Sequence, residues 1–319
     1  MMLITKNKRI LHKRITLLYL ILSMGIGHRV TVAQTYMTTD EAIRHPKSEL
    51  ADRIEESESL TVMSYNIYRG MEKDTSDNKT VYTDWLKKIG VDILAIQETA
   101  KTTQQSLLEQ AEAYNHPYAE ILSENEYSIA LTSKYPIKNV RRFHKDLHHG
   151  LLMADIGDYT IMVTHLSPFT YKKRHQEIET ILEIVRNEKK KEGLIFLGDF
   201  NSVSRLDSTL YTESDRYLRN MKMLAKKYSS HDNLINGEKL DFEVHDKIVN
   251  FPFTDVLHWK NTDYLIARPG RIDFIYVSND LKNEIKEAKF VFDEFTKYYS
   301  DHFPLLMTLQ TGGRSGKDK

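Results

Sequence analysis

The stretch IFLGDFNS, residues 195–202, joins an apolar run to an acid and an amide that stand two residues apart. The run is typical of a buried β-strand, and such a strand usually stops at a polar turn. Two interpretations compete here: Asp199 and Asn201 either form an Asx-type turn or are delivered by the strand into a functional site. Because side chains alternate along an extended chain, Asp199 and Asn201 should project to the same side, which favours a joint role.

Other apolar segments also end in, or are interrupted by, residues of the types that bind metals or transfer protons. Asn66 interrupts LTVMSYNIY, Glu98 ends ILAIQE, and His165 ends IMVTH. Asp273 shares a face with apolar residues in RIDFIYV, where a buried carboxylate needs a cationic or hydrogen-bonding partner. Taken singly, each residue is also compatible with a structural role, as a satisfied buried amide, a helix cap or a surface imidazole.

The dipeptide Asp301-His302 precedes the last apolar segment, FPLLMTLQ, and is a candidate partner for Asp273. An aspartate that accepts the imidazole N–H fixes the ring tautomer and leaves the second nitrogen to take a proton from water. The repeated pattern thus supplies oxygen ligands for a hard divalent cation together with a His-Asp pair. This combination predicts metal-assisted hydrolysis of a phosphoester.

The expected elements indicate one α/β domain at residues 60–310, with a mixed or largely antiparallel sheet arrangement. Strands are expected at residues 60–68, 91–99, 116–122, 126–137, 150–157, 159–167, 194–200, 271–278, 287–295 and 303–310. Helices are expected at residues 84–90, 102–114, 171–191 and 215–228. In the third helix the apolar residues recur at helical spacing, which predicts a stripe facing a sheet: Ile178, Ile181, Leu182 and Val185.

The first 33 residues have the pattern of a secretory signal: a basic start, an apolar run at residues 15–26, and the small-residue site TVA. The alternatives are an uncleaved anchor and a buried N-terminal helix. A membrane span needs roughly 18 to 20 apolar residues, more than this run contains. We therefore expect cleavage before Gln34, a leader at residues 34–59, a flexible tail at residues 311–319 and no membrane segment in the mature chain.

Composition limits the function further. The 319-residue chain contains no cysteine, which excludes disulfides, thiol catalysis and thiolate zinc sites. Residues 1–33 hold six Lys or Arg and no Asp or Glu, so their removal leaves 39 basic against 45 acidic residues, a net charge of −6. Non-specific nucleic-acid binding depends mainly on neutralising phosphates, so this charge disfavours a DNA-directed enzyme.

At these motifs the chain resembles the endonuclease/exonuclease/phosphatase superfamily, the deoxyribonuclease I-like group that also contains abasic-site endonucleases, neutral sphingomyelinases and inositol polyphosphate 5-phosphatases. The resemblance spans roughly residues 60–310 and rests on six segments in the family's order: SYNIYRG, AIQET, THLS, LGDFNS, RIDFIYVS and SDHFPL. It implies a four-layer α/β sandwich, in which two mixed or mainly antiparallel sheets pack face to face with helices outside. Together with the predicted signal, it implies a secreted, bacterial-type member.

The resemblance also implies a metal site. Glu98 would be the principal ligand, Asn66 would lie at the metal, and Asp301 would assist. The usual ion in the family is Mg²⁺, with Mn²⁺ as the alternative.

The remaining motif residues receive catalytic roles by the same resemblance. His302, oriented by Asp273, would polarise or deprotonate the attacking water, while Asp199 and Asn201 would position water and phosphate. His165 would donate a hydrogen bond to the phosphoryl oxygen as charge develops. Family members are described with either an Asp199-type or a His302-type residue as general base, so this assignment stays open.

Substrate choice is expected to depend on residues 203–270, a long and less regular part of the chain. Arg268 is a candidate substrate contact, and ordinary loop packing is the alternative for it and for the other candidates: Tyr211, His231, His245, His258 and Trp259. The leading interpretation is a secreted or periplasmic magnesium-dependent phosphodiesterase that acts on a small or lipid-linked phosphoester. The alternatives are an extracellular nuclease acting on DNA or RNA, and a non-catalytic binding protein on the same fold. No protein partner is implied.

Overall fold

The computed structural model describes residues 54, 57–125, 127–213, 215–260 and 270–311, and the structural statements below concern these residues. All of them belong to one unit of the chain, residues 47–319. The predicted signal, most of the predicted leader and tail, and Arg268 lie outside the described residues. Among the helices of the described part, none combines the length and apolarity needed to cross a membrane.

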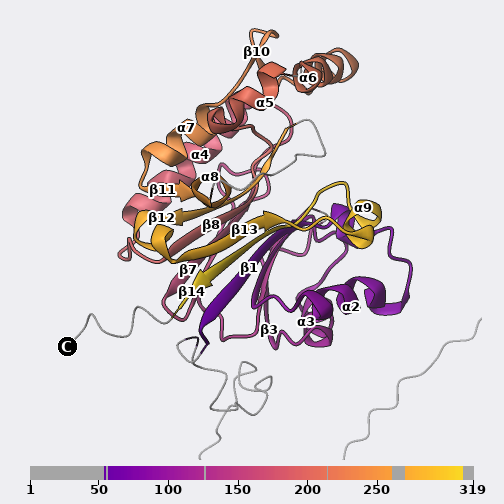
Figure 1. Cartoon of the computed structure of the whole chain (residues 1–319). Helices are drawn as coiled ribbons and strands as arrows, with labels where there is room; N and C mark the ends of the chain where they lie inside the picture. The colour runs from indigo at the N-terminus through magenta and orange to yellow at the C-terminus, as the bar shows by residue number, and fades with distance from the viewer. Residues whose placement is uncertain (1–53, 55–56, 126, 214, 261–269, 312–319) are drawn as a thin grey trace, which may run out of the picture. The chain divides into compact units, whose positions relative to one another are not determined.

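Two mixed sheets of six strands each form the centre of the described chain (Figure 1). The first sheet contains, in spatial order, β13 (Ile285–Phe290), β14 (Leu305–Gln310), β1 (Ser59–Asn66), β2 (Ile93–Gln97), β4 (Ile129–Ser133) and β3 (Tyr118–Ile121). The second contains β11 (Phe253–Asp255), β12 (Asp273–Ser278), β8 (Leu194–Asp199), β7 (Tyr159–His165), β6 (Leu151–Ile156) and β5 (Lys138–Phe143). The pairs β1/β2 and β7/β8 are parallel, and the other pairs in these sheets are antiparallel.

Helices and short elements connect and cover these strands. The α-helices are α1 (Tyr68–Met71), α2 (Thr80–Ile89), α3 (Gln104–Ala113), α4 (Tyr171–Asn187), α5 (Ser208–Glu213), α6 (Arg216–Lys227), α7 (Glu243–Asn250), α8 (Val256–Lys260) and α9 (Glu294–Tyr299). The 3₁₀ turns are η3 (Asp77–Lys79), η4 (Arg205–Asp207) and η5 (Asn279–Glu284). A small hairpin is formed by β9 (Leu234–Ile235) and β10 (Lys239–Leu240).

The two sheets pack face to face through the side chains that alternate along their strands. Val62 of β1 and Ile93 of β2 are fully buried in one apolar cluster with Ile195 and Leu197 of β8 and Ile275 of β12. This cluster is the centre of the sandwich, and it confirms the predicted packing of two sheets.

Helices cover the outer faces, which completes the four layers (Figure 1). Tyr65 of β1 packs against Trp85 of α2, with ring centroids 5.8 Å apart, on the outer face of the first sheet. On the second sheet α4 buries the whole predicted stripe: Ile178, Ile181, Leu182 and Val185. Burying a side chain of this size is worth roughly 1.5–3 kcal/mol, so the stripe rather than helix propensity holds α4 on the sheet.

The strand directions bring the polar motif residues to one end of the sandwich. Because β7 and β8 are parallel, their carboxyl ends coincide and His165 lies opposite Asp199. β12 runs antiparallel to β8, so its first residue, Asp273, also lies opposite Asp199. In the first sheet the parallel strands β1 and β2 end together at Asn66 and Gln97. The strand-end residues noted in the sequence therefore converge because of sheet topology.

The sequence-based boundaries are wrong at one notable place. Residues 287–295 are predicted as a single strand, but β13 ends at Phe290 and α9 begins at Glu294. The helix starts here because the Asp293 carboxylate accepts the Thr296 N–H at 2.8 Å, and the Thr296 hydroxyl accepts the Asp293 N–H at 3.0 Å. Strand β5 and helices α5, α7 and α8 are further elements that the sequence pattern did not predict.

Gly198 allows the close approach of β7 and β8 beside the polar end. Its φ of 148° lies in a region that side chains rarely adopt, and a Cβ there would lie 1.9 Å from the Thr164 carbonyl oxygen. The glycine in LGDFNS is thus required for the pairing that sets His165 beside Asp199.

We predict that Gly198→Ala lowers the free energy of unfolding by at least about 3 kcal/mol, because the added methyl group meets backbone as well as an unfavourable φ. Gly237→Ala is the matched control, since Gly237 also has a positive φ, 72°, but an added Cβ would have no atom within 4 Å. This control substitution should lower the free energy of unfolding by only about 1 kcal/mol. Urea unfolding followed by circular dichroism measures both, and equal losses would contradict the close-approach argument.

Candidate active site

A hydrogen-bonded chain of side chains joins the two sheets at their polar end. Asn66, fully buried at the end of β1, donates from Nδ2 to Asp199 Oδ2 at 3.0 Å and to Glu98 Oε1 at 3.1 Å. Its Oδ1 accepts the Tyr68 N–H at 3.0 Å, which fixes the orientation of the amide. The structure therefore turns the amide nitrogen of Asn66, rather than its oxygen, toward the two carboxylates. Its role as a metal ligand stays a prediction.

Glu98 follows β2 with a positive φ of 63° and is half-buried. Its Oε2 accepts the Arg69 N–H at 3.0 Å, and its carbonyl oxygen accepts the Gly70 N–H at 2.6 Å. A Cβ at Gly70 would lie 2.4 Å from the Ala100 carbonyl oxygen, so this contact also requires glycine. Burial raises the pKa of Glu98, while the hydrogen bonds from Asn66 and Arg69 oppose that rise.

Asp199 and Asn201 meet through a turn, not through strand alternation. β8 ends at Asp199, and Asn201 has a φ of 47°, so the two side chains are not on a continuous extended chain. Asp199 Oδ1 accepts the Asn201 N–H at 2.8 Å, which is an Asx-type turn. Asn201 Nδ2 donates to the Leu166 carbonyl at 3.0 Å, and the residue also lines a cavity. Of the two, Asn201 lines the cavity and Asp199 does not, so their joint role stays a prediction, and strand alternation is the wrong reason for it.

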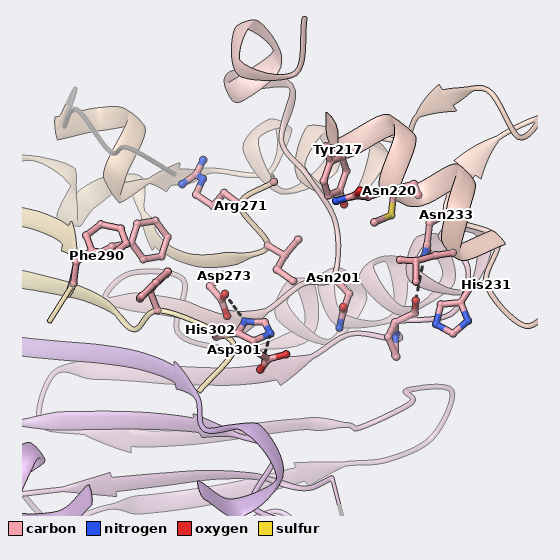
Figure 2. A pocket seen from close by; sticks show the side chains of 17 residues that line it. Asn201, Tyr217, Asn220, His231, Asn233, Arg271, Asp273, Phe290, Asp301 and His302 are labelled. Atoms are coloured by element: carbon pink, nitrogen blue, oxygen red, sulfur yellow. Dashed lines mark hydrogen bonds and ion pairs between the residues drawn. The ribbon is translucent and has the colours of Figure 1, made fainter. Parts of the chain in front are cut away.

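His302 and Asp273 form the expected His-Asp pair (Figure 2). The His302 Nδ1 lies 2.7 Å from Asp273 Oδ2, and its Nε2 lies 3.7 Å from Asp199 Oδ2. Burial lowers the pKa of His302, but the carboxylates of Asp273 and Asp199 outweigh it and raise that pKa to about 10. Asp301 stands at the rim, with about half of its side chain exposed and its Oδ1 4.0 Å from His302 Nε2.

His165 is buried on the other side of Asp199. Its Nε2 lies 3.5 Å from Asp199 Oδ2, and its Nδ1 has no hydrogen-bond partner among the described residues. Burial lowers the pKa of His165 to about 3, so the ring is neutral near pH 7. The ring stacks on His149 at 4.1 Å between centroids, a neighbour that the sequence reasoning missed although the doublet His148-His149 was visible.

Ser300 is a second residue that the sequence reasoning missed. Its Oγ donates to the Asn66 carbonyl at 2.8 Å and accepts the His302 N–H at 3.0 Å. The hydroxyl thus ties the end of β1 to the loop that carries His302. Its position at the start of SDHFPL was the available signal, because a buried serine beside a motif commonly serves as a hydrogen-bond bridge.

A cavity of about 550 Å³ opens beside His302 (Figure 2). Three polar motif residues lie on its floor, Asn201, Asp273 and His302, and Asp301 lines its rim. Its walls come from α6 on one side and from the segments around β13 and β14 on the other: Tyr217, Asn220, Met221 and Leu224, and Phe290, Phe292 and Phe303. A phosphate held near His302 would therefore leave the rest of the substrate between α6 and a group of phenylalanine rings.

The structure separates the candidate contacts of residues 203–270. His231 lines the cavity, as expected of a substrate contact. The other described candidates are absent from its lining: Tyr211, His245, His258 and Trp259. Tyr211 is buried among aromatic rings, and His245 is fully buried with both ring nitrogens hydrogen-bonded. For these two the loop-packing alternative holds, and Arg268 lies outside the described residues.

The buried carboxylates at and just behind the floor fit a divalent cation held by oxygen atoms. Asp199, Asp273 and His302 offer ligand atoms that all lie within 4.8 Å of one another. Asp273 Oδ1 is buried without a hydrogen-bond partner in the described structure, and Glu98 contributes a further carboxylate through Asn66. Carboxylates crowded at a buried site repel one another, and a hard cation such as Mg²⁺ relieves that repulsion. The donor set does not identify the metal.

Solved structures of nucleic-acid enzymes share this fold. An AP endonuclease from Archaeoglobus fulgidus aligns with a TM-score of 0.56 and 17% identity, covering 78% of this chain and 99% of that chain. A 3′ phosphatase from Neisseria, bound to a product DNA hairpin, aligns with a TM-score of 0.56 and 17% identity, covering 78% of this chain and 98% of that chain. A 3′-5′ exonuclease from Neisseria meningitidis aligns with a TM-score of 0.56 and 16% identity, covering 79% of this chain and 100% of that chain. No curated protein sequence matches the chain significantly.

A family-level sequence match agrees with the fold. The sequence model of the Endonuclease/Exonuclease/phosphatase family matches residues 63–302, most of the 319-residue chain. The matched range includes every residue of the polar network from Asn66 to His302. The chain therefore belongs to the Endonuclease/Exonuclease/phosphatase family.

Proposed function

We propose that this protein is a metal-dependent phosphoester hydrolase that cleaves a phosphodiester with activated water. Its family consists of hydrolases that act on phosphoester bonds, and the polar network supports the finer assignment. The observation that carries the proposal is that Asp273 and His302 line the floor of the cavity, with ligand atoms of Asp199 within 4.8 Å of both, while Asn66 links Asp199 to Glu98.

Each residue at the floor has a role that its contacts support. His302, held by Asp273 at 2.7 Å, would face the scissile phosphate, and Asn201, which also lies on the floor of the cavity, would help to position it. Asp199 or His302 takes the proton of the attacking water, and Asp199 is the favoured base because a pKa of about 10 leaves His302 already protonated near pH 7. Glu98 and Asp199 would hold the cation, with Mg²⁺ ahead of Mn²⁺, and the bound ion would supply Lewis-acid stabilisation of phosphoryl charge.

A small or lipid-linked substrate is the preferred class. The cavity walls carry apolar side chains, among them Met221, Leu224 and Phe292, which suit an apolar or ring-bearing group next to the phosphate. The net charge of −6 for the chain without residues 1–33 also argues against broad attraction to nucleic acid. We further propose that the protein is exported, to the periplasm or outside the cell, on the strength of the signal pattern in residues 1–33.

A nuclease is the second candidate, and α6 is the observation that favours it. This helix carries five cationic residues and no acidic one: Arg216, Arg219, Lys222, Lys226 and Lys227. It also forms one wall of the cavity. A cationic helix beside the cleavage site suits a phosphate backbone. The similar solved structures are described as an AP endonuclease, a 3′ phosphatase bound to a DNA hairpin and a 3′-5′ exonuclease.

We predict that His302→Gln and Asp199→Asn each lower kcat at least about a hundredfold, because each loses a group that acts on the phosphate or the water. Hydrolysis of bis(p-nitrophenyl) phosphate with Mg²⁺ provides the rate. His258→Gln, an exposed position on α8 outside the cavity, is the control and should keep the wild-type rate. Thermal melts verify that each variant is folded, and full activity in both test variants would rule out this mechanism.

Chelation should abolish activity, and Mg²⁺ should restore it, because the crowded carboxylates need a cation to function together. Mn²⁺ is expected to restore it as well. Glu98→Gln should raise the Mg²⁺ concentration for half-maximal rate at least about tenfold, since it removes the charge of the principal expected ligand. The measurement is the rate against free metal concentration. Undiminished turnover in excess EDTA would contradict metal dependence.

A double charge reversal on α6, Lys222→Glu with Lys226→Glu, separates the two substrate classes. A small or lipid-linked substrate predicts that hydrolysis of sphingomyelin or a generic diester stays within about twofold. The nuclease alternative predicts that cleavage of single-stranded DNA falls more than about tenfold at low salt and that the effect shrinks at high salt. Lys87→Glu with Lys88→Glu on α2 makes the same change of charge away from the cavity and serves as the matched control.

A further inference from the structure

A second group of ligating side chains lies outside the catalytic network, where α4 meets the start of α7. His175 is on α4, Asp241 precedes α7, and Glu243 is the first residue of α7. Ligand atoms of the three residues all lie within 4.8 Å of one another. His175 Nε2 is 2.9 Å from Asp241 Oδ1, and His175 Nδ1 is 3.2 Å from Glu243 Oε2.

The two contacts of His175 require an additional positive charge. A neutral imidazole carries one N–H and one lone pair, so it donates to only one of two carboxylates. The second contact then sets a nitrogen lone pair against a carboxylate oxygen, which is repulsive. Either a second ring proton or a metal ion must resolve this arrangement.

The environment of Asp241 favours the metal ion. Asp241 is 4% exposed, and its Oδ2 is buried without a hydrogen-bond partner among the described residues. A buried carboxylate oxygen without a donor costs on the order of 1–3 kcal/mol. A second proton on His175 would satisfy the contact with Oδ1 but would leave Oδ2 without a partner. A cation bound by both oxygens of the Asp241 carboxylate would give each of them a partner.

The surrounding charges leave a negative excess at this place. Lys247 Nζ lies 2.6 Å from Glu243 Oε1 and 2.7 Å from Glu179 Oε1, so one cation is shared by two carboxylates. With Asp241 the local count is three negative charges against one positive charge when His175 is neutral. Arg174, next to His175 on α4, donates its hydrogen bonds to the Ser167 carbonyl and to Asn233, and its charge acts on Asp241 as well as on the buried Glu177. Counting Arg174 and Glu177 together adds one charge of each sign, so the local excess stays at two negative charges.

We propose that His175, Asp241 and Glu243 bind a divalent transition-metal ion, with Zn²⁺ as the best match. One imidazole nitrogen and two carboxylate oxygens, completed by water, form a ligand set that Zn²⁺ accepts. The ion ties α4 to the segment that leads into α7. Because Arg174 of α4 holds Asn233, which lines the cavity, the site braces the cavity wall and takes no part in hydrolysis.

Zinc binding to the chelator-stripped full chain tests the proposal. After equilibrium dialysis with Zn²⁺ and elemental analysis, His175→Gln and Glu243→Gln should each hold about one Zn²⁺ per chain less than the wild type. Zn²⁺ should also raise the melting temperature of the wild type by more than that of these two variants, which keep the cation site of the catalytic network. Both residues are partly exposed, so the substitutions leave the core intact.

Two further variants make the outcome specific. Glu98→Ala, which alters the catalytic network, should keep the Zn²⁺-dependent stabilisation, so this result does not depend on the proposed hydrolase activity. Glu179→Gln is the matched control, because Glu179 contacts the same Lys247 but lies outside the ligand set, and it should bind as much Zn²⁺ as the wild type. Unchanged stoichiometry and unchanged stabilisation in His175→Gln and Glu243→Gln would show an ion pair only and would overturn the proposal.

Discussion

The hydrogen bond from Asn66 Nδ2 to Asp199 Oδ2, 3.0 Å long, is a buried polar link between two sheets whose central contacts are apolar. Both side chains are at most 2% exposed, so the carboxylate depends on protein donors rather than on water. Asn66 reaches it from the first sheet and the Asn201 N–H reaches it from its own turn. The relative position of the sheets and the geometry of the candidate site are therefore set by the same few contacts.

The sequence predicts this network well where residue type and strand ends determine the contact. Asp273 and His302 are paired as expected, because a carboxylate at the start of a core strand requires a cationic partner and the dipeptide before the last strand supplies one. The turn at Asn201 is predicted for the wrong reason, since strand alternation does not extend past the end of β8. The amide orientation of Asn66 was beyond prediction, because it depends on the Tyr68 N–H across a left-handed turn.

Residues 203–270 show why specificity is harder to predict than the catalytic floor. A helix is predicted at residues 215–228, but this prediction does not reveal that Met221 and Leu224 line the cavity, because their placement depends on tertiary contacts. His245 has the residue type of a substrate contact, yet it is buried with its Nε2 3.0 Å from the Ser202 carbonyl oxygen. Histidine serves either as a substrate contact or as a buried hydrogen-bonding residue, so its position in the sequence alone does not distinguish these two roles.

Arg271 holds the junction between residues 203–270 and the strand that carries Asp273. Its buried guanidinium donates to Asp207 Oδ2 at 2.9 Å and to Asp255 Oδ1 at 3.0 Å, and it lies 4.0 Å from the ring centroid of Phe274. Burying a guanidinium costs several kcal/mol unless charged partners are equally fixed, so both carboxylates must hold their places. The strand that follows carries Asp273, whose position is thereby tied to η4 and β11. By contrast, α6 buries none of its residues. Substitutions on α6 can therefore change this wall of the cavity without disturbing the buried contacts that hold the His-Asp pair.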